Sequence, residues 1–259
     1  MSAALTLWSK QMQKLRVHPE EAVGMLIQPI LWVVLFGIGM KGLLGPAITG
    51  GGDIYITFMV PGIVALTAMS GAIGGGLVWL TERIQGIVKE YLAAPIPRLS
   101  ILTGNALSIV TKTLFQAIVI LVIGVLIGAQ GNLDPLGWLG GLVLVMAYGL
   151  GFAGIALAFA SKTDNPGSYH MVIFLLTLPL LFMSNALYPL ESMPKWMEIC
   201  ARLNPTSYVV DGMRQTFIDS SITLAGAEFL PLWLCFIVVM AFAAFGMLLA
   251  YLAFQRAIK

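Results

Sequence analysis

Long apolar runs alternate with short polar stretches along nearly all of this 259-residue chain. A transmembrane helix needs about 20 consecutive, mostly apolar residues, and six of the runs approach or exceed that length. The pattern therefore predicts an all-α membrane protein with six transmembrane helices in a single domain covering residues 1–259. The predicted spans lie at about 22–44, 54–80, 102–127, 136–160, 171–187 and 229–254.

The most polar stretch between two spans runs from Thr81 to Thr103. Its apolar residues recur at the spacing of one helix face, and its charged residues occupy the other face. Pro95 and Pro97 end such a helix before the third span begins. We therefore predict a short amphipathic helix within residues 81–101, placed to receive movement from a partner outside the bilayer. Its apolar face comprises Ile84, Ile87, Val88, Tyr91 and Leu92.

Residues 1–21 form a second amphipathic segment, with Leu5, Trp8 and Met12 on one face and lysines on the other. A helix of this kind lies in the headgroup plane of a membrane; a soluble tail is the alternative. Lysine and arginine are enriched in this segment, in residues 81–101 and at the C-terminus. The positive-inside rule therefore predicts that both termini and the polar stretch are cytoplasmic.

Residues 188–228 form the longest segment between two predicted spans. Met193, Trp196, Met197 and Cys200 recur at helical spacing, with Ser192 placed to cap this helix. Asn204-Pro205 ends it, and a second short helix follows with Val210, Met213 and Phe217 on one face. We predict a pair of re-entrant helices dipping into the outer leaflet; the alternative is a pair lying flat on the surface.

Composition, charge and missing motifs exclude several classes of function. Apolar residues make up 59% of the chain, so it is not a soluble domain. The net charge of +2 without a basic cluster argues against nucleic-acid binding. A proton- or sodium-coupled carrier requires acidic residues within its spans. No acidic residue lies within the core of a predicted span, so the sequence argues against this class of transporter. The sequence has no G-x-x-x-x-G-K-[ST] phosphate loop and no metal-ligand spacing, so we expect no metal site and no ATP hydrolysis by this chain alone.

Two polar or small-residue features within the spans each allow two interpretations. Gly71, Gly74, Gly75 and Gly76 crowd the second span, where they either form a hinge or permit close helix packing. Lys112 lies within the third span, where it either snorkels to the inner headgroups or faces a wet interior.

Three groups of residues resemble the type 2 ATP-binding-cassette (ABC) exporter permeases, and among them the daunorubicin-resistance type. The first is the stretch from Glu82 to Arg98; the others are QPILW at 28–32 with FG at 36–37, and LNPTSY at 203–208 with DGMR at 211–214. The family resemblance implies that residues 81–101 are a coupling helix that docks on an ATPase. The implied coupling residues are Glu82, Arg83, Gly86, Lys89, Glu90, Leu92, Pro95, Pro97 and Arg98.

The resemblance also implies the partners. They are two copies of a cytoplasmic ABC ATPase, which binds ATP and Mg, a second permease copy in a homodimer, and membrane lipid. No cofactor is expected in this chain itself, which is expected in the plasma membrane, or cell inner membrane, of a bacterium or archaeon. Replacing Glu82 or Arg98 by alanine is expected to abolish export without unfolding the protein, on the reasoning that both face the ATPase.

We therefore expect a permease subunit that exports amphipathic drugs or lipids from the cytoplasm or inner leaflet. The alternative within transport is export of a lipid-linked glycan, and the alternative from another class is a membrane scaffold. By the same resemblance, the path lies between the first, second and fifth spans. Its candidate residues are Gln28, Thr67, Met69, Ser70, Phe174, Thr177, Phe182, Met183 and Asn185, with Met59 and Ser184 as further candidates.

Overall fold

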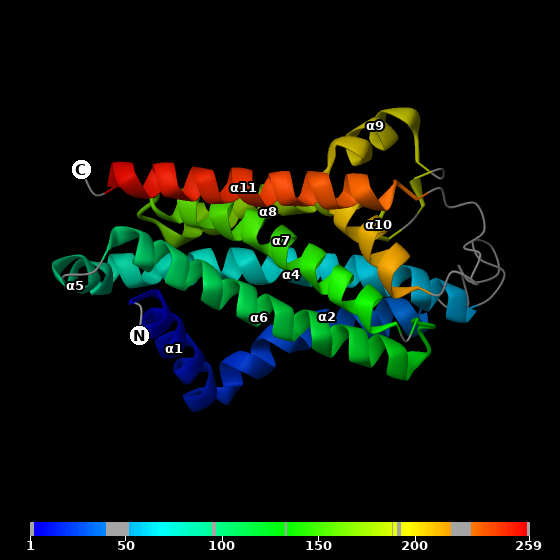
Figure 1. Cartoon of the computed structure of the whole chain (residues 1–259), viewed down its shortest axis with the longest axis horizontal. Helices are drawn as coiled ribbons and strands as arrows, with labels where there is room; N and C mark the ends of the chain where they lie inside the picture. The colour runs from blue at the N-terminus through cyan, green and yellow to red at the C-terminus, as the bar shows by residue number, and fades with distance from the viewer. Residues whose placement is uncertain are drawn as a thin grey trace.

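The computed structural model describes residues 3–39, 52–94, 97–132, 134–187, 189–190, 193–218 and 229–257. Within these ranges the chain is nearly all helical, which confirms the predicted fold class (Figure 1). The helices are α1 (Ala3–Val17), α2 (Pro19–Gly39), α4 (Gly52–Ile84), α5 (Ile87–Ala93), α6 (Arg98–Ile127), α7 (Pro135–Ala160), α8 (Pro166–Phe182), α9 (Lys195–Leu203), α10 (Pro205–Phe217) and α11 (Leu232–Ala257).

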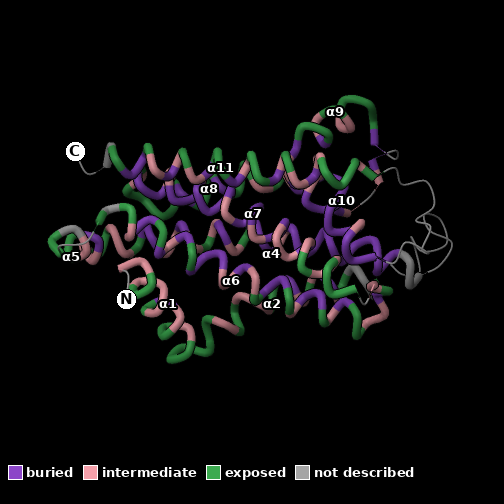
Figure 2. Tube along the Cα trace, in the orientation of Figure 1, coloured by how far each residue is buried: buried purple, intermediate pink, exposed green. Residues whose placement is uncertain are grey.

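Helices α4 and α7 form the centre of the bundle. α4 contacts α2, α6, α7, α8 and α10, and α7 packs between α4 and α11. Figure 2 shows the consequence for burial: α4 and α7 are largely enclosed, whereas α11 keeps one exposed apolar face along its length. Such exposed apolar faces are what lipid covers in a membrane protein.

Small residues let the central helices approach closely. A Cβ added at Gly154 would lie 2.6 Å from the backbone nitrogen of Met247, so α7 and α11 meet backbone to backbone. Gly76 of α4 sits equally close to α7, where an added Cβ would lie 2.7 Å from the Cβ of Ala156. In lipid, where the hydrophobic effect does not drive helices together, packing of this kind holds a bundle.

Four described helical segments are long and apolar enough to cross a membrane: Tyr55–Ile84, Leu99–Ile127, Pro135–Ala160 and Leu232–Gln255. The predicted fifth span forms the shorter apolar helix Pro166–Phe182. The predicted first span corresponds to α2, and its last residues, 40–44, lie outside the described residues. The chain is thus a multi-pass membrane protein, and the six-span count stays a prediction.

The two ends of the bundle differ. Figure 1 places both termini, α1 and α5 at one end, and α9 and α10 at the other. This shared end agrees with an even number of crossings. The compartment that this end faces stays a prediction.

The segment predicted as two short helices contains α9 and α10. The Asn204 side chain accepts a hydrogen bond from the backbone N–H of Thr206 and so caps α10. α10 is buried against α4, α7 and α11, while α9 exposes Trp196 and Ile199. α9 begins at Lys195 after Pro194, and Ser192 lies outside the described residues. Re-entry of the pair into the outer leaflet stays a prediction.

Candidate functional site

The predicted coupling helix is divided in two by a glycine. α4 runs on to Ile84, and α5 begins only at Ile87. Between them Gly86 has φ of 82°, a left-handed conformation that side-chain-bearing residues adopt only with strain. The expected continuous face from Ile84 to Leu92 is therefore wrong in this detail. A stiff α4 instead ends in a sharp turn that redirects the seven-residue α5.

Glu82, at the inner end of α4, joins α4 to the N-terminal helix. Its carboxylate accepts a hydrogen bond from Gln11 Nε2 at 3.0 Å and lies 3.7 Å from the Lys10 ammonium. The Glu82 side chain is only 12% exposed. The Glu82 side chain therefore contacts α1 in this structure, and its role in coupling to an ATPase stays a prediction.

Lys10 also binds α5. Its ammonium donates a hydrogen bond to the Tyr91 hydroxyl and lies over the Tyr91 ring, 5.0 Å from the centroid. Partial burial alone would lower the pKa of Lys10, but the Tyr91 hydrogen bond and the charge of Glu82 outweigh it and leave that pKa raised. Through Lys10, helices α1, α4 and α5 form one connected unit.

Arg83 extends this unit to the junction between α7 and α8. Its guanidinium donates to the backbone carbonyls of Ser161 and Thr163, the latter at 2.7 Å, and pairs with the Asp164 carboxylate. Adjacent residues of α4 thus point in two directions: Glu82 binds α1, and Arg83 binds the α7–α8 junction. We call α1, α5, the C-terminal end of α4 and this junction the inner assembly, after the cytoplasmic side that the sequence predicts for them.

The remaining candidate coupling residues lie on or beside α5. Lys89 and Glu90 are exposed on it, whereas Val88 is buried. Leu92 lies in α5, Pro97 precedes α6, and Arg98 is the first residue of α6. Pro95 lies outside the described residues. The exposed surface available to a partner at this end therefore includes Lys89 and Glu90.

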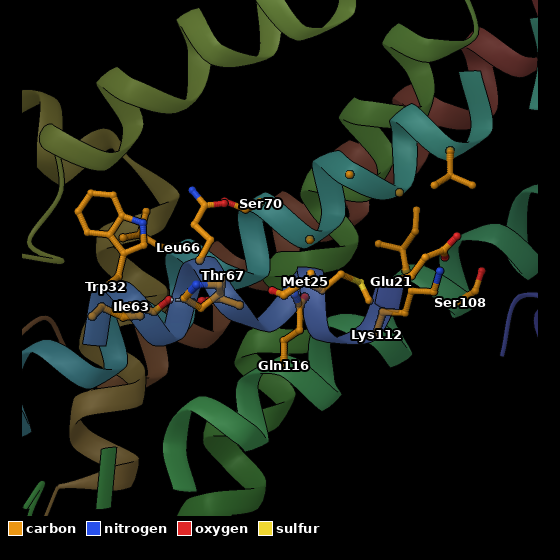
Figure 3. A pocket seen from close by; sticks show the side chains of 18 of the residues that line it. Glu21, Met25, Trp32, Ile63, Leu66, Thr67, Ser70, Ser108, Lys112 and Gln116 are labelled. Atoms are coloured by element: carbon orange, nitrogen blue, oxygen red, sulfur yellow. Dashed lines mark hydrogen bonds between the residues drawn. The ribbon is translucent and has the colours of Figure 1, made fainter. Parts of the chain in front are cut away.

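A cavity of about 560 Å³ lies next to the inner assembly and extends from it toward the middle of the bundle. Its walls come from α2, α4, α6 and α8, and Gln11 of α1 reaches its inner end. Figure 3 shows Lys112, Glu21 and Ser108 together at one end and Trp32, Ile63 and Leu66 at the other. This volume lies within the range of small-molecule sites, about 300–1,000 Å³.

A proline in α2 shapes the cavity wall. Pro29 has no N–H, so the Met25 carbonyl one turn earlier lacks its helical partner. Gln116 of α6 supplies the missing donor, with Nε2 2.9 Å from the Met25 oxygen. The proline thus creates a polar contact that ties α2 to α6 at mid-cavity.

Four of the predicted path residues line this cavity: Gln28, Thr67, Ser70 and Phe174. The others do not. Met69 is buried against the Tyr148 hydroxyl, Asn185 hydrogen-bonds Asp211, and Thr177 bonds the Ile173 carbonyl of its own helix. Phe182 is exposed and Met183 half-buried; the further candidates Met59 and Ser184 are buried elsewhere.

A polar stripe on α6 supplies the cavity's lysine and several of its other polar side chains, and the sequence analysis predicts no path candidate there. Ser108, Lys112 and Gln116 repeat every four residues and all line the cavity, together with Asn105. This spacing marks one helix face, so the sequence contains the signal. Of the two interpretations of Lys112, the structure supports the one in which it faces the interior.

A second polar cluster, near the other end of the bundle, is buried. Arg214 of α10 donates to the Phe58 carbonyl at 3.1 Å and to the Asn185 carbonyl at 2.7 Å, and lies 3.4 Å from Asp211. The other Asp211 oxygen accepts from the Leu230 N–H at 3.2 Å. This cluster joins α4, α10 and the segments beside α8 and α11 and lines no described cavity, so its role is structural.

Helices long and apolar enough to cross a bilayer, packed around a cavity of small-molecule size, define a multi-pass membrane protein with a candidate ligand site. Comparison with protein families is specific: residues 2–218 match the family described as ABC-2 type transporter, and the chain belongs to that family. Members are membrane subunits of transporters that work with a cytoplasmic ATP-binding subunit and are not themselves ATPases. The prediction of a permease without enzymatic activity is thereby confirmed.

Three relatives illustrate the similarity. The ycf38 protein of Cyanophora paradoxa, named as a transport permease, is 32% identical over 213 residues, covering 80% of this chain and 71% of that protein. The daunorubicin resistance ABC transporter permease DrrB1 of Streptomyces coeruleorubidus is 23% identical over 83% of this chain and 75% of its own length. The inner membrane transport permease YadH of Escherichia coli is 25% identical over 98% and 95%, respectively.

Proposed function

We propose that this chain is the permease of an ATP-driven exporter that moves amphipathic molecules out of the cytoplasm or the inner leaflet. The observation that carries the proposal is the Glu82–Arg83 pair, which joins α1 and the α7–α8 junction to the inner end of α4. Because α4 also lines the cavity, displacement of the inner assembly moves a cavity wall.

Force enters, in this proposal, through α5. Its exposed Lys89 and Glu90 offer charges to an ATP-binding subunit. Gly86 turns α5 away from α4, and Lys10 holds α5 to α1, so a push on α5 is shared by both helices. Interfaces between packed helices pass on such displacements as rigid-body shifts.

The cavity suits an amphipathic molecule because its lining is mixed. Gln28, Thr67 and Ser70 line it together with aliphatic and aromatic side chains, and Figure 3 shows Thr67 and Ser70 between its two ends. Sugars are commonly bound on stacked aromatic platforms; among the described lining residues, Trp32 and Phe174 are the aromatic ones. The lining therefore favours a drug or lipid over a lipid-linked glycan. The DrrB1 relative is named for resistance to a drug.

A second copy of this chain would complete the transporter. α8 exposes Met171, Phe174, Leu175 and Leu178 on its surface, and Phe174 and Leu178 also line the cavity. Lipid can cover any apolar face of the bundle, so what distinguishes α8 is that Phe174 and Leu178 also line the cavity, which a second permease at this face would close. We therefore propose a homodimer with two ATPase copies, with both termini cytoplasmic in a bacterial or archaeal membrane.

The test uses the full chain assembled with its ATP-binding subunit in proteoliposomes. Arg83→Gln removes the ion pair with Asp164 and weakens the bonds to the α7–α8 junction, so we expect ATP hydrolysis to continue while transport per ATP falls about tenfold or more. Arg202→Gln is the matched control, because Arg202 is exposed on α9 and pairs within its own helix. Full coupling in Arg83→Gln would contradict the proposal.

A further inference from the structure

The charges at the inner end of the cavity do not cancel. Glu21 pairs with Lys14 of α1 at 2.9 Å, and Glu82 lies 3.7 Å from Lys10 of the same helix. Each acidic residue near the cavity thus has its own lysine. Lys112 makes no ion pair or hydrogen bond within the described parts of the chain, and Glu21 and Glu82 attract it at longer range. Among the described residues at this end of the cavity, the Lys112 ammonium is therefore a positive charge without a paired carboxylate.

An unpaired ammonium in a wall of apolar side chains is costly, because the charge is partly withdrawn from water. Lys112 is only partly exposed, and its neighbours around the cavity include Met25, Val78 and Ile109. A negatively charged ligand at this position would recover the lost solvation, and hydrogen bonds to charged groups are the stronger ones.

Polarity changes along the cavity in one direction. Figure 3 places Lys112 with Glu21 and Ser108 at one end, Thr67 and Ser70 further along, and Trp32, Ile63 and Leu66 at the far end. α2 and α6 both start near the inner assembly, so the charged end faces it. A ligand that fits this gradient has its charged head beside Lys112 and its apolar part toward Trp32.

A second unsatisfied group lies next to Lys112. Gln116 is one helical turn away on the same face of α6 and is 3% exposed. Its amide nitrogen binds the Met25 carbonyl, but its Oε1 has no hydrogen-bond partner among the described residues. A Cβ at Gly71 would lie 2.5 Å from this oxygen, so the oxygen packs against the glycine and is covered in the described structure. Gln116 lines the cavity, so a donor on a ligand would reach this unpartnered acceptor once the side chain turns toward it.

We propose that this cavity binds amphipathic molecules with an anionic head group, a phosphate or a carboxylate, held by Lys112. A hydroxyl or amide N–H near the head donates to Gln116, and the apolar part lies toward Trp32. That the bound molecule is a transported substrate rests on the proposed function, but binding itself requires neither ATP nor a partner. The inference deepens that function by assigning the substrate class.

The experiment measures binding to the full chain in nanodiscs of phosphatidylcholine. The probe is an uncharged dansyl-labelled long-chain amide, excited through tryptophan and displaced by dodecyl phosphate, dodecyl maltoside or dodecyltrimethylammonium. We expect dodecyl phosphate to displace the probe best. Lys112→Gln should weaken dodecyl phosphate about tenfold to a hundredfold, the range of one charged hydrogen bond. Lys112→Arg should retain most of the affinity.

A variant that reverses the charge at position 112 distinguishes loss of the head-group contact from loss of folding. Lys112→Glu should reverse the preference and favour dodecyltrimethylammonium, which an unfolded protein would not do. Lys195→Gln is the matched control and should change nothing, because Lys195 is the exposed first residue of α9, at the other end of the bundle. Equal affinity for the three competitors, or an unchanged Lys112→Gln, would overturn the inference.

Two further outcomes separate this inference from the proposed function. The same measurement is repeated in nanodiscs that also contain anionic phosphatidylglycerol. If Lys112 instead reaches the headgroups of the surrounding bilayer, Lys112→Gln will alter the effect of this anionic lipid but not the competition, and the inference fails. Anion-selective binding without ATP-driven export would retain the inference and refute the proposed function. Export without any charge preference would do the reverse.

Discussion

Arg214 and Asp211 are charged side chains with 2% and 1% of their surfaces exposed. A buried charge is tolerated when protein groups replace the water that would solvate it. Here those groups include an aromatic ring, because the Arg214 guanidinium carbon lies 3.6 Å from the Phe58 ring centroid. The cluster ties four segments together. Its loss should therefore affect stability much more than the loss of an exposed pair.

Arg214→Ala should lower the free energy of unfolding by about 3–5 kcal/mol, because it leaves the Asp211 carboxylate buried without its cation. Arg202→Ala is the control: Arg202 pairs with Glu198 across one turn of α9, is half exposed, and should cost at most about 0.5 kcal/mol. Unfolding of both variants in detergent micelles measures the difference. Similar values for the two would show that the buried cluster is not a stabilising one.

The sequence identified several of these residues without their contacts. Helical spacing and the family motif both place Asp211 and Arg214 in the second short helix, but neither shows that Phe58 and Asn185, outside that helix, supply their partners. Glu82 is a coupling residue only by the family resemblance. Its contact with Gln11, 71 residues away, was not accessible to pattern reasoning.

At the scale of helices, the glycines of α4 are contact points. Added Cβ atoms at Gly75 and Gly76 would overlap Ile109 of α6 and the hydroxyl of Tyr169 in α8, whereas one at Gly74 would meet nothing within 4 Å. α4 stays one continuous helix through this region. These observations favour close packing over a hinge at residues 71–76, and the turn in the chain comes at Gly86 instead.

Gly76→Ala should destabilise the bundle by about 2 kcal/mol, because the new methyl forces α4 away from α7 and α8. Gly74→Ala, two residues earlier in the same helix, should be neutral or stabilising by up to about 1 kcal/mol, since alanine favours the helix. Thermal unfolding of the two variants in the same detergent distinguishes them. A hinge rather than a packing role would leave Gly76→Ala as stable as wild type.

The pattern of apolar residues predicted the long helices well, because a span must be apolar for about 20 residues whatever its neighbours. It placed α4, α6, α7 and α11 within a few residues of their observed bounds. It failed at Gly86, where one left-handed residue interrupts an otherwise continuous helical pattern. It also missed the cavity stripe on α6, because three polar residues hardly alter the hydropathy of a 30-residue helix.

For the whole molecule, the proposed function requires the inner assembly to link two sites: a surface for an ATP-binding subunit and a cavity for a substrate. Glu82 and Arg83 make that link through side chains, and α4 makes it through its backbone. The arrangement works only if the end that carries α5 faces the ATPase in the cytoplasm.

Photo-crosslinking in living cells tests this requirement most directly. A photoreactive amino acid replaces the exposed Lys89 of α5, and in a second variant it replaces Trp196 of α9, which is 60% exposed at the opposite end. The account predicts a crosslink from position 89 to the ATP-binding subunit and none from position 196. A crosslink to that subunit from position 196, with none from position 89, would contradict it.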